Sequence, residues 1–182
     1  MDGIAEITRS SDPVVAATII LFLLRTHTLQ RIVFLTVGRI KTPWIAEGVK
    51  HFLSRVQPHM RIETVEVPAS KQLDADRYRE EETTAILKKL EKLDGELWLL
   101  DETGKGMTSV EFSKVLGMAK DAGTTLIFIL GGAYGVGKEV KEKAHRILQL
   151  SQMTFPHEFC SLVFLEQLYR ASEIERGTGY HH

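Results

Sequence analysis

The chain has 182 residues, of which 43% are hydrophobic and 26% are charged, and 23 Lys and Arg residues nearly balance 24 Asp and Glu residues. This profile is typical of one compact globular domain, and the formal charge of −1 excludes a polybasic protein that holds nucleic acid by phosphate neutralisation alone. The single cysteine, Cys160, excludes an internal disulfide and a cysteine-cluster zinc site, and it fits a reducing cytosol.

The only long apolar run, at residues 14–24, is much shorter than the roughly 20 residues that a membrane-spanning helix needs. The segment before it carries three acidic residues against only Arg9, which argues against a secretory signal. We therefore expect a cytoplasmic protein with no membrane partner. Because strand-like sequence begins at about residue 30, residues 1–29 are interpreted as an amino-terminal extension. It is disordered, packed on the domain as an extra amphipathic segment, or the product of a mis-assigned start.

From residue 30 to residue 182, apolar runs of strand length alternate with segments of helical period. This alternation predicts an α/β domain with a largely parallel sheet. The predicted strands are 31–37, 62–67, 96–100 and 124–130. The predicted helices are 43–57, 77–93, 109–121, one that places Val140, Ala144, Ile147 and Leu148 on one side, and 158–175.

Two helix starts carry explicit capping signals. Thr42 precedes Pro43, so that Thr42 is the expected N-cap and Pro43 the first helical residue. Thr108 and Glu111 have the spacing of a capping box. The third strand is expected to end in a polar turn at residues 101–106.

A glycine-rich loop at residues 131–137 follows the uniformly apolar strand 124–130. Such a turn presents bare backbone N–H groups to a ligand, which is typical of nucleotide-like ligands. It fails as a phosphate loop because Glu139 replaces the Ser or Thr that would hold magnesium. It also fails as a dinucleotide fingerprint because Val140 replaces the last glycine. A glycine turn that only lets strand and helix pack closely remains open.

Four segments taken together are more specific than the glycine loop alone: 100–105 (LDETGK), 128–135 (FILGGAYG), 150–157 (LSQMTFPH) and 165–171 (LEQLYRA). Their order and spacing resemble those of the ribosomal RNA large subunit methyltransferase H family, the minimal SPOUT methyltransferases. The resemblance runs from about residue 30 to residue 182, and the family lacks a counterpart of residues 1–29.

This resemblance implies a homodimer with an α/β-knot fold, in which the carboxyl-terminal segment forms a deep trefoil knot. Hydrophobic periodicity alone would not suggest a knot, because knots are nearly absent among protein folds. The implied cofactor is S-adenosylmethionine, and no metal is expected. The implied reaction is methyl transfer to N3 of a pseudouridine in 23S rRNA of the large subunit, on the assembled ribosome. The cofactor contacts implied by the resemblance are Leu100, Gly131, Leu150, Ser151, Gln152, Met153, Thr154 and Phe155.

Two side chains are the expected catalytic residues. His157 directly follows the predicted cofactor segment, and Arg170 lies in an otherwise apolar helix. A base, or a cation that stabilises the deprotonated imide, would assist methylation of a weakly acidic nitrogen. A structural role of His157 at a helix start and an ion pair of Arg170 with Glu166, four residues before it, remain alternatives.

The expected RNA contacts are Glu166, Tyr169, Tyr180 and His181. Tyr169 either stacks on a base or packs in the core, and the tail 180–182 is expected to reach a partner's site. The apolar last helix favours a dimer interface.

The two halves of the predicted domain carry opposite charge. Residues 30–93 hold 12 basic and 9 acidic residues, whereas residues 94–182 hold 9 basic and 12 acidic residues. The basic half therefore supplies the expected phosphate contacts. These are Arg31, Arg39, Lys41, Lys50, Arg55 and Arg61.

Three functions compete at this point. The resemblance implies a methyltransferase, while a non-catalytic RNA-binding module of the same fold and a nucleotide-binding phosphotransferase remain as alternatives. Binding of S-adenosylmethionine without magnesium-dependent ATP binding would separate the first from the third.

Overall fold

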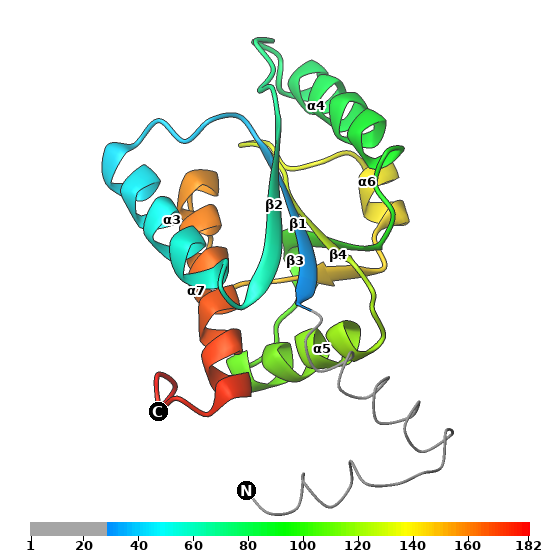
Figure 1. Cartoon of the computed structure of the whole chain (residues 1–182). Coiled ribbons are helices and arrows are strands. Elements are labelled where there is room, and N and C mark those ends of the chain that lie inside the picture. Colours follow the sequence, from blue (N-terminus) through cyan, green and yellow to red (C-terminus); the bar gives the residue numbers. More distant parts are fainter. Residues whose placement is uncertain (1–28) are drawn as a thin grey trace, which may run out of the picture.

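The computed structural model describes residues 29–182 and shows a five-stranded, all-parallel sheet with the strand order β2-β1-β4-β3-β5 (Figure 1). The strands are β1 (Gln30–Val37), β2 (Met60–Val67), β3 (Glu96–Lys105), β4 (Leu126–Leu130) and β5 (Arg146–Leu148). The helices are α3 (Pro43–Val56), α4 (Ala75–Leu90), α5 (Ser109–Asp121), α6 (Lys138–Lys143) and α7 (His157–Arg176). The predicted α/β class with a parallel sheet is confirmed.

Helices cover both faces of the sheet, as a parallel sheet requires. Side chains of α3, α5 and α7 pack on one face in a cluster that contains Phe34, Trp98 and Phe128. Side chains of α4 and α6 pack on the other face, against Leu35 and Ile129. Figure 1 shows these two layers, with α3 and α7 side by side.

The central strand β4 is buried along its whole length, which explains its uniformly apolar sequence. It pairs with β1 on one side and β3 on the other, so neither its edges nor its faces reach solvent. The chain leaves this strand at Leu130 and enters the glycine loop directly. The core thereby fixes where the loop begins.

The prediction of one helix with Val140 and Leu148 on the same side is wrong for the second half of that segment. The helix α6 ends at Lys143, and Ile147 and Leu148 lie on strand β5. The chain becomes extended at Ala144, and the His145 backbone N–H donates to the Leu97 carbonyl at 2.9 Å. This segment thus pairs with the free edge of β3. A short apolar run in the sequence does not show whether it will form a helix or pair with such an edge.

The polar turn predicted at residues 101–106 is also only partly correct. Strand β3 continues to Lys105, and both Leu100 and Lys105 pair with Leu148 of β5. Residues 101–104 therefore form an irregularity within the strand. A Cβ on Gly104 would lie 2.6 Å from the Ile147 carbonyl oxygen, so the close passage of β5 requires glycine there.

The two capping predictions have different outcomes. The capping box of Thr108 and Glu111 is present at the start of α5. Thr42 is the N-cap residue of α3, but its side chain makes no capping hydrogen bond. The carboxylate of Glu158, from α7, instead accepts hydrogen bonds from the backbone N–H groups of Lys41 and Thr42, each at 3.1 Å.

The extension predicted for residues 1–29 lies outside the described residues, apart from Leu29. Among residues 29–182, no helix combines the length and the apolar character needed to cross a bilayer. The trefoil knot implied by the family resemblance stays a prediction.

Candidate functional site

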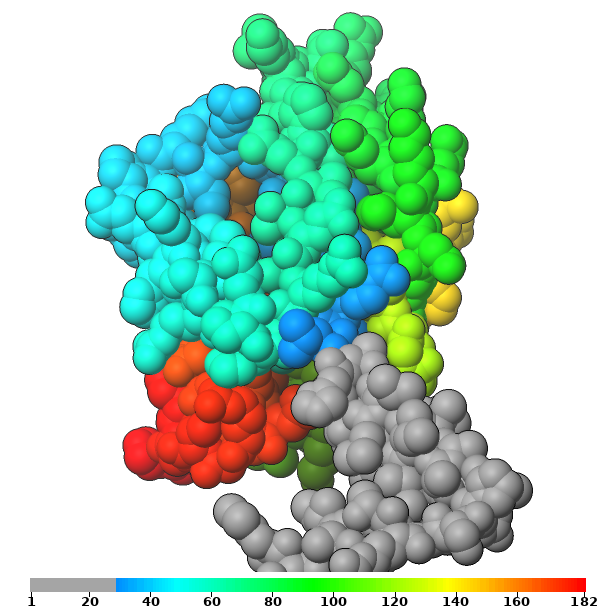
Figure 2. All heavy atoms as spheres, viewed as in Figure 1, coloured from blue at the N-terminus to red at the C-terminus, as the bar shows by residue number. Residues whose placement is uncertain are grey.

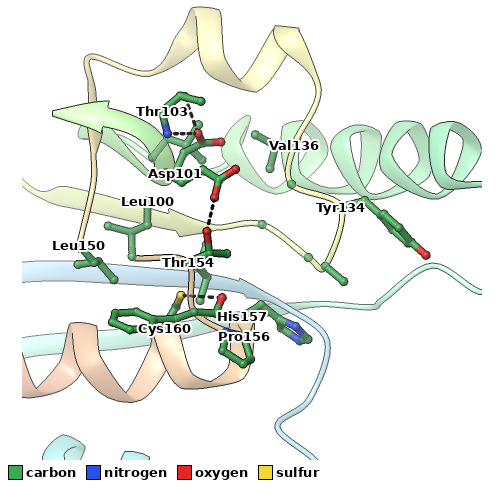
Figure 3. Close-up of a pocket in the computed structure, with 18 of the residues that line it drawn as sticks. Leu100, Asp101, Thr103, Tyr134, Val136, Leu150, Thr154, Pro156, His157 and Cys160 are labelled. Carbon is green, nitrogen blue, oxygen red and sulfur yellow. Dashed lines mark hydrogen bonds between the residues drawn. The ribbon is translucent and has the colours of Figure 1, made fainter. Parts of the chain in front are cut away.

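A cavity of about 710 Å³ lies where β3 and β4 end, the edge at which parallel α/β sheets bind ligands. Three segments that are far apart in the sequence form its walls (Figure 3). Its lining residues are Arg79, Leu99, Leu100, Asp101, Glu102, Thr103, Leu130, Gly131, Gly132, Ala133, Tyr134, Gly135, Val136, Lys141, Leu150, Ser151, Met153, Thr154, Phe155, Pro156, His157 and Cys160.

The glycine loop supplies one wall of the cavity as bare backbone. A Cβ on Gly131 would lie 2.7 Å from a methyl carbon of Val136, so the loop closes tightly on itself. The Gly135 backbone N–H donates to the Gly132 carbonyl at 3.0 Å, and Gly135 has a φ of +72° that favours glycine. The loop can therefore offer backbone groups to a ligand at close range.

The segment that leads into α7 supplies a second wall. The Ser151 hydroxyl accepts from the Met153 backbone N–H at 2.9 Å, which folds the segment into a turn. The Thr154 hydroxyl donates to the Glu102 carboxylate at 3.0 Å and ties this wall to β3. Figure 3 shows Leu100, Leu150 and Thr154 gathered at this part of the cavity.

The Asp101 carboxylate and the Lys141 ammonium form an ion pair of 2.9 Å in the cavity wall. Burial by itself raises the pKa of Asp101, but hydrogen bonds from Thr103 and the charge of Lys141 hold it below its ordinary value. Asp101 is therefore an ionised carboxylate whose charge is already compensated. Since Lys141 lies 40 residues further along the chain, no sequence pattern indicates this pair.

His157 is the first residue of α7, and it also lines the cavity. Both interpretations of this residue, as a helix-start residue and as a site residue, thus agree with its position. In Figure 3 its ring lies beside Pro156, at the end of the 150–157 segment.

The three cavity segments lie within the part of the chain that a known family covers. A family model described as "Predicted SPOUT methyltransferase" matches residues 30–181. The chain belongs to the SPOUT methyltransferase family. Enzymes of this family generally transfer a methyl group from S-adenosylmethionine.

Two curated relatives illustrate the similarity. The chain is 37% identical over 154 residues to the ribosomal RNA large subunit methyltransferase H of Geotalea daltonii. This match covers 84% of this chain and 100% of that protein. It is 38% identical over 156 residues to the protein of the same name from Maridesulfovibrio salexigens. That match covers 85% of this chain and 99% of the relative.

A solved structure described as a probable methyltransferase from Bordetella pertussis has a TM-score of 0.53 at 13% identity. The match covers 82% of this chain and 99% of that one. At this identity, the likeness shows a shared fold.

The SPOUT cofactor residues predicted from the sequence mostly converge on the cavity. Those that line it are Leu100, Gly131, Leu150, Ser151, Met153, Thr154 and Phe155, whereas Gln152 is exposed and does not line it.

The remaining predicted residues form a second cluster around the carboxyl-terminal half of α7. Arg170 donates to Glu166 at 2.6 Å, so the intrahelical ion pair that the spacing suggested is present. The Arg170 guanidinium lies 4.7 Å from the centre of the Tyr180 ring, and the Tyr180 hydroxyl donates to Glu166 at 3.3 Å. Tyr169 is buried and packs edge-on against Tyr180, and His181 is exposed.

The cavity and this second cluster are separate within one chain. His157 and Arg170 lie 13 residues apart on α7, which corresponds to about 20 Å along a helix. One chain therefore does not bring the two expected catalytic side chains together.

Three polar side chains that line the cavity lie outside the segments singled out in the sequence: Arg79, Lys141 and Cys160. They come from α4, α6 and α7, which only the fold brings together. Within residues 29–182, no three His, Cys, Asp or Glu side chains gather as metal ligands would.

Proposed function

We propose that this SPOUT methyltransferase transfers a methyl group from S-adenosylmethionine to N3 of a pseudouridine in large-subunit rRNA, acting as a homodimer on the assembled ribosome. The observation that carries the proposal is the cavity at the ends of β3 and β4. The segments that the family resemblance implied for cofactor binding meet there. The relatives' name, ribosomal RNA large subunit methyltransferase H, supports rRNA as the substrate.

The cavity suits a nucleoside cofactor in size and chemistry. Its volume falls within the range of roughly 300–1,000 Å³ that small-molecule sites occupy. Leu100, Leu150 and Phe155 offer apolar walls for an adenine ring, and the backbone of 131–135 and 151–154 offers uncharged hydrogen-bonding groups. When bound, S-adenosylmethionine supplies an electrophilic methyl group.

The protein's task in such a reaction is to hold donor and acceptor in line and to manage the acceptor's proton. His157 lies at the cavity and is positioned to accept that proton. Arg170 stabilises the deprotonated nucleobase of the RNA, or contacts the RNA in another way. The other expected RNA contacts are Glu166, Tyr169, Tyr180 and His181. Since Arg170 lies far from the cavity of its own chain, we assign it to the cavity of a second copy.

The surface of one chain supports a dimer. Leu162 and Val163 on α7 are only half-buried, and Trp44 on the adjacent α3 is 59% exposed although it packs against Phe159. Figure 2 shows the last turns of α7 and the tail at the surface, next to α3 and β2. A second copy that covers this face would bring its tail towards the cavity. The knot would fix the segment that holds the cofactor.

The phosphate contacts belong to the basic half of the chain. Arg31, Lys41, Lys50 and Arg61 are exposed, as are Arg39 and Arg55. Arg39 is paired with Glu66 at 3.3 Å, and the Arg55 guanidinium lies 4.6 Å from the centre of the Tyr169 ring. Arg31, Lys41, Lys50 and Arg61 form no such ion pair or cation–π contact among the described residues and are therefore better placed to contact phosphates.

The test is methyl incorporation into ribosomes that lack this modification, with mass spectrometry of the rRNA to locate the methyl group. We expect His157→Ala and Arg170→Ala to lower incorporation by about 100-fold or more, the size of a general acid–base contribution. Calorimetry should show that both variants still bind the cofactor. A non-catalytic RNA-binding module would give no methylation by the wild-type protein, and a phosphotransferase would bind ATP with magnesium instead.

A further inference from the structure

Glu82, on α4, is a buried carboxylate that the proposed reaction does not use. It is 1% exposed, and its Oε1 accepts a hydrogen bond from the Ser70 backbone N–H at 3.0 Å. Its Oε2 is buried and has no hydrogen-bond partner. A buried charged oxygen without a partner is destabilising unless it gains a proton or a nearby positive charge.

This orphan oxygen lies directly behind the glycine loop. A Cβ on Gly132 would overlap the Glu82 Oε2, so only a glycine permits the carboxylate to approach this closely. Gly132 itself lines the cavity. A single backbone residue therefore separates the carboxylate from the cavity.

Other side chains of α4 hold the loop in this position. The Thr83 hydroxyl accepts from the Gly137 backbone N–H at 2.7 Å, and the ring centres of Tyr78 and Tyr134 lie 5.0 Å apart, edge to face. The loop is thus fastened to α4 at its tip and at its end. The distance between Glu82 and the cavity is fixed by these contacts.

The cationic side chains that line the cavity compensate Glu82 only in part. Lys141 is paired with Asp101 and Arg79 with Asp76, whereas His157 is near enough to interact with Glu82. Glu102 is exposed and accepts a hydrogen bond from Thr154. Burial raises the pKa of Glu82, while the hydrogen bond from the Ser70 backbone, the neighbouring Tyr78 hydroxyl and the charge of His157 oppose the rise. Because a charge interacts more strongly where water is excluded, a positive ligand in the cavity would stabilise the ionised form.

We propose that Glu82 makes the cavity selective for a positively charged cofactor, so that the sulfonium of S-adenosylmethionine binds more tightly than its neutral thioether product, S-adenosylhomocysteine. Glu82 acts across Gly132 and does not touch the reacting atoms, which makes it a specificity-determining residue. The inference rests on the proposed function. It supplies a physical reason for the product to leave once the positive charge is lost.

Calorimetric titration with three ligands tests this inference: S-adenosylmethionine, S-adenosylhomocysteine, and sinefungin, which carries an ammonium group near the sulfonium position. The wild-type protein is expected to prefer both cationic ligands. Glu82→Gln, which keeps the shape and removes the charge, should weaken both by about tenfold and leave the thioether affinity within about twofold. Glu80→Gln removes a charge from an exposed position on α4 and should keep the wild-type preference.

If Glu82→Gln lowered the affinity for all three ligands equally, the residue would only shape the loop. If the preference for cationic ligands were unchanged, the charge of Glu82 would have no effect on binding. Either result overturns the inference. Glu82→Asp shortens the side chain by one methylene and so moves the charge away from the cavity. It should reduce the preference for cationic ligands by a smaller factor than Glu82→Gln. This variant tests the same inference if the Gln variant does not fold. Failure of the wild-type protein to bind any of the three ligands would instead overturn the proposed function, and this inference with it.

Discussion

Gly131 shows how a single residue determines whether the cavity can exist. It follows the last residue of the buried strand β4, and the loop folds back so closely that a methyl carbon of Val136 lies 2.7 Å from the position of a Cβ. Strand and loop both resist movement at this point, because the strand is packed on both faces. Any side chain larger than hydrogen must displace the cavity wall.

We therefore expect Gly131→Val to lower the affinity for S-adenosylmethionine at least tenfold, since overpacking of this kind costs about 1–3 kcal/mol. Calorimetry measures the affinity. Gly117→Ala is the matched control, because a Cβ at this position of α5 meets nothing within 4 Å. The control should raise the free energy of unfolding by roughly 0.5–1 kcal/mol and leave the affinity unchanged. Unchanged affinity in Gly131→Val would place the cofactor elsewhere.

Single residues could be placed from the sequence where the chain is locally constrained. The capping box of Thr108 and Glu111 needs only four consecutive residues, and the structure contains it. At Thr42 the predicted positions are correct, because Thr42 is the N-cap and Pro43 begins α3, but the Thr42 side chain makes no capping hydrogen bond. The backbone N–H of Thr42 instead donates to Glu158, more than 100 residues away. Local hydrogen bonds can be predicted from spacing, whereas a partner on another helix depends on how α3 and α7 pack.

At the scale of elements, the contact between α3 and α7 joins the basic half of the chain to the acidic half. Glu158 lies one residue after His157 and accepts hydrogen bonds from the backbone N–H groups of Lys41 and Thr42, directly before α3. The hydrogen bond from the Lys41 backbone holds the pKa of Glu158 below its ordinary value. The start of α7 is thus fixed relative to the start of α3 by two hydrogen bonds, both donated by backbone N–H groups.

Glu158→Ala is expected to lower the free energy of unfolding by about 1 kcal/mol, the usual net contribution of a hydrogen bond. Chemical denaturation measured by circular dichroism provides the value. Thr42→Ala removes the side chain that the sequence pattern favoured as the cap, and it should change the stability by much less, because that hydroxyl makes no capping bond. This prediction would be contradicted if Thr42→Ala proved the more destabilising of the two.

At the scale of the whole molecule, the separation of the cavity from the Arg170 cluster is the feature that matters most. Arg170 is held by Glu166 and Tyr180, and Glu173 anchors the tail by accepting a hydrogen bond from the Thr178 hydroxyl at 2.6 Å. The hydrogen bond from Thr178 lowers the pKa of Glu173 below its ordinary value. The tail is thus ordered on its own α7, next to the face that we assign to the dimer.

A mixing experiment tests whether one site uses residues of two chains. The His157→Ala and Arg170→Ala proteins should each be inactive alone, but a mixed dimer contains one cavity with His157 from one chain and Arg170 from the other. Random exchange makes half of the dimers mixed, each with one intact site, so about a quarter of the wild-type methyl incorporation should return. Incorporation that stays at the level of the single variants would mean that both residues serve one chain.

The sequence by itself determined the alternation of strands and helices, the buried central strand and the position of the glycine loop. These features depend on periodicity and backbone conformation over a few residues. Only the tertiary structure decided that Ile147 and Leu148 join the sheet, that Lys141 pairs with Asp101 and that Glu82 lies behind Gly132. Each of these depends on segments that the chain brings together from a distance, and no local pattern encodes which free edge, charge or glycine a segment will meet.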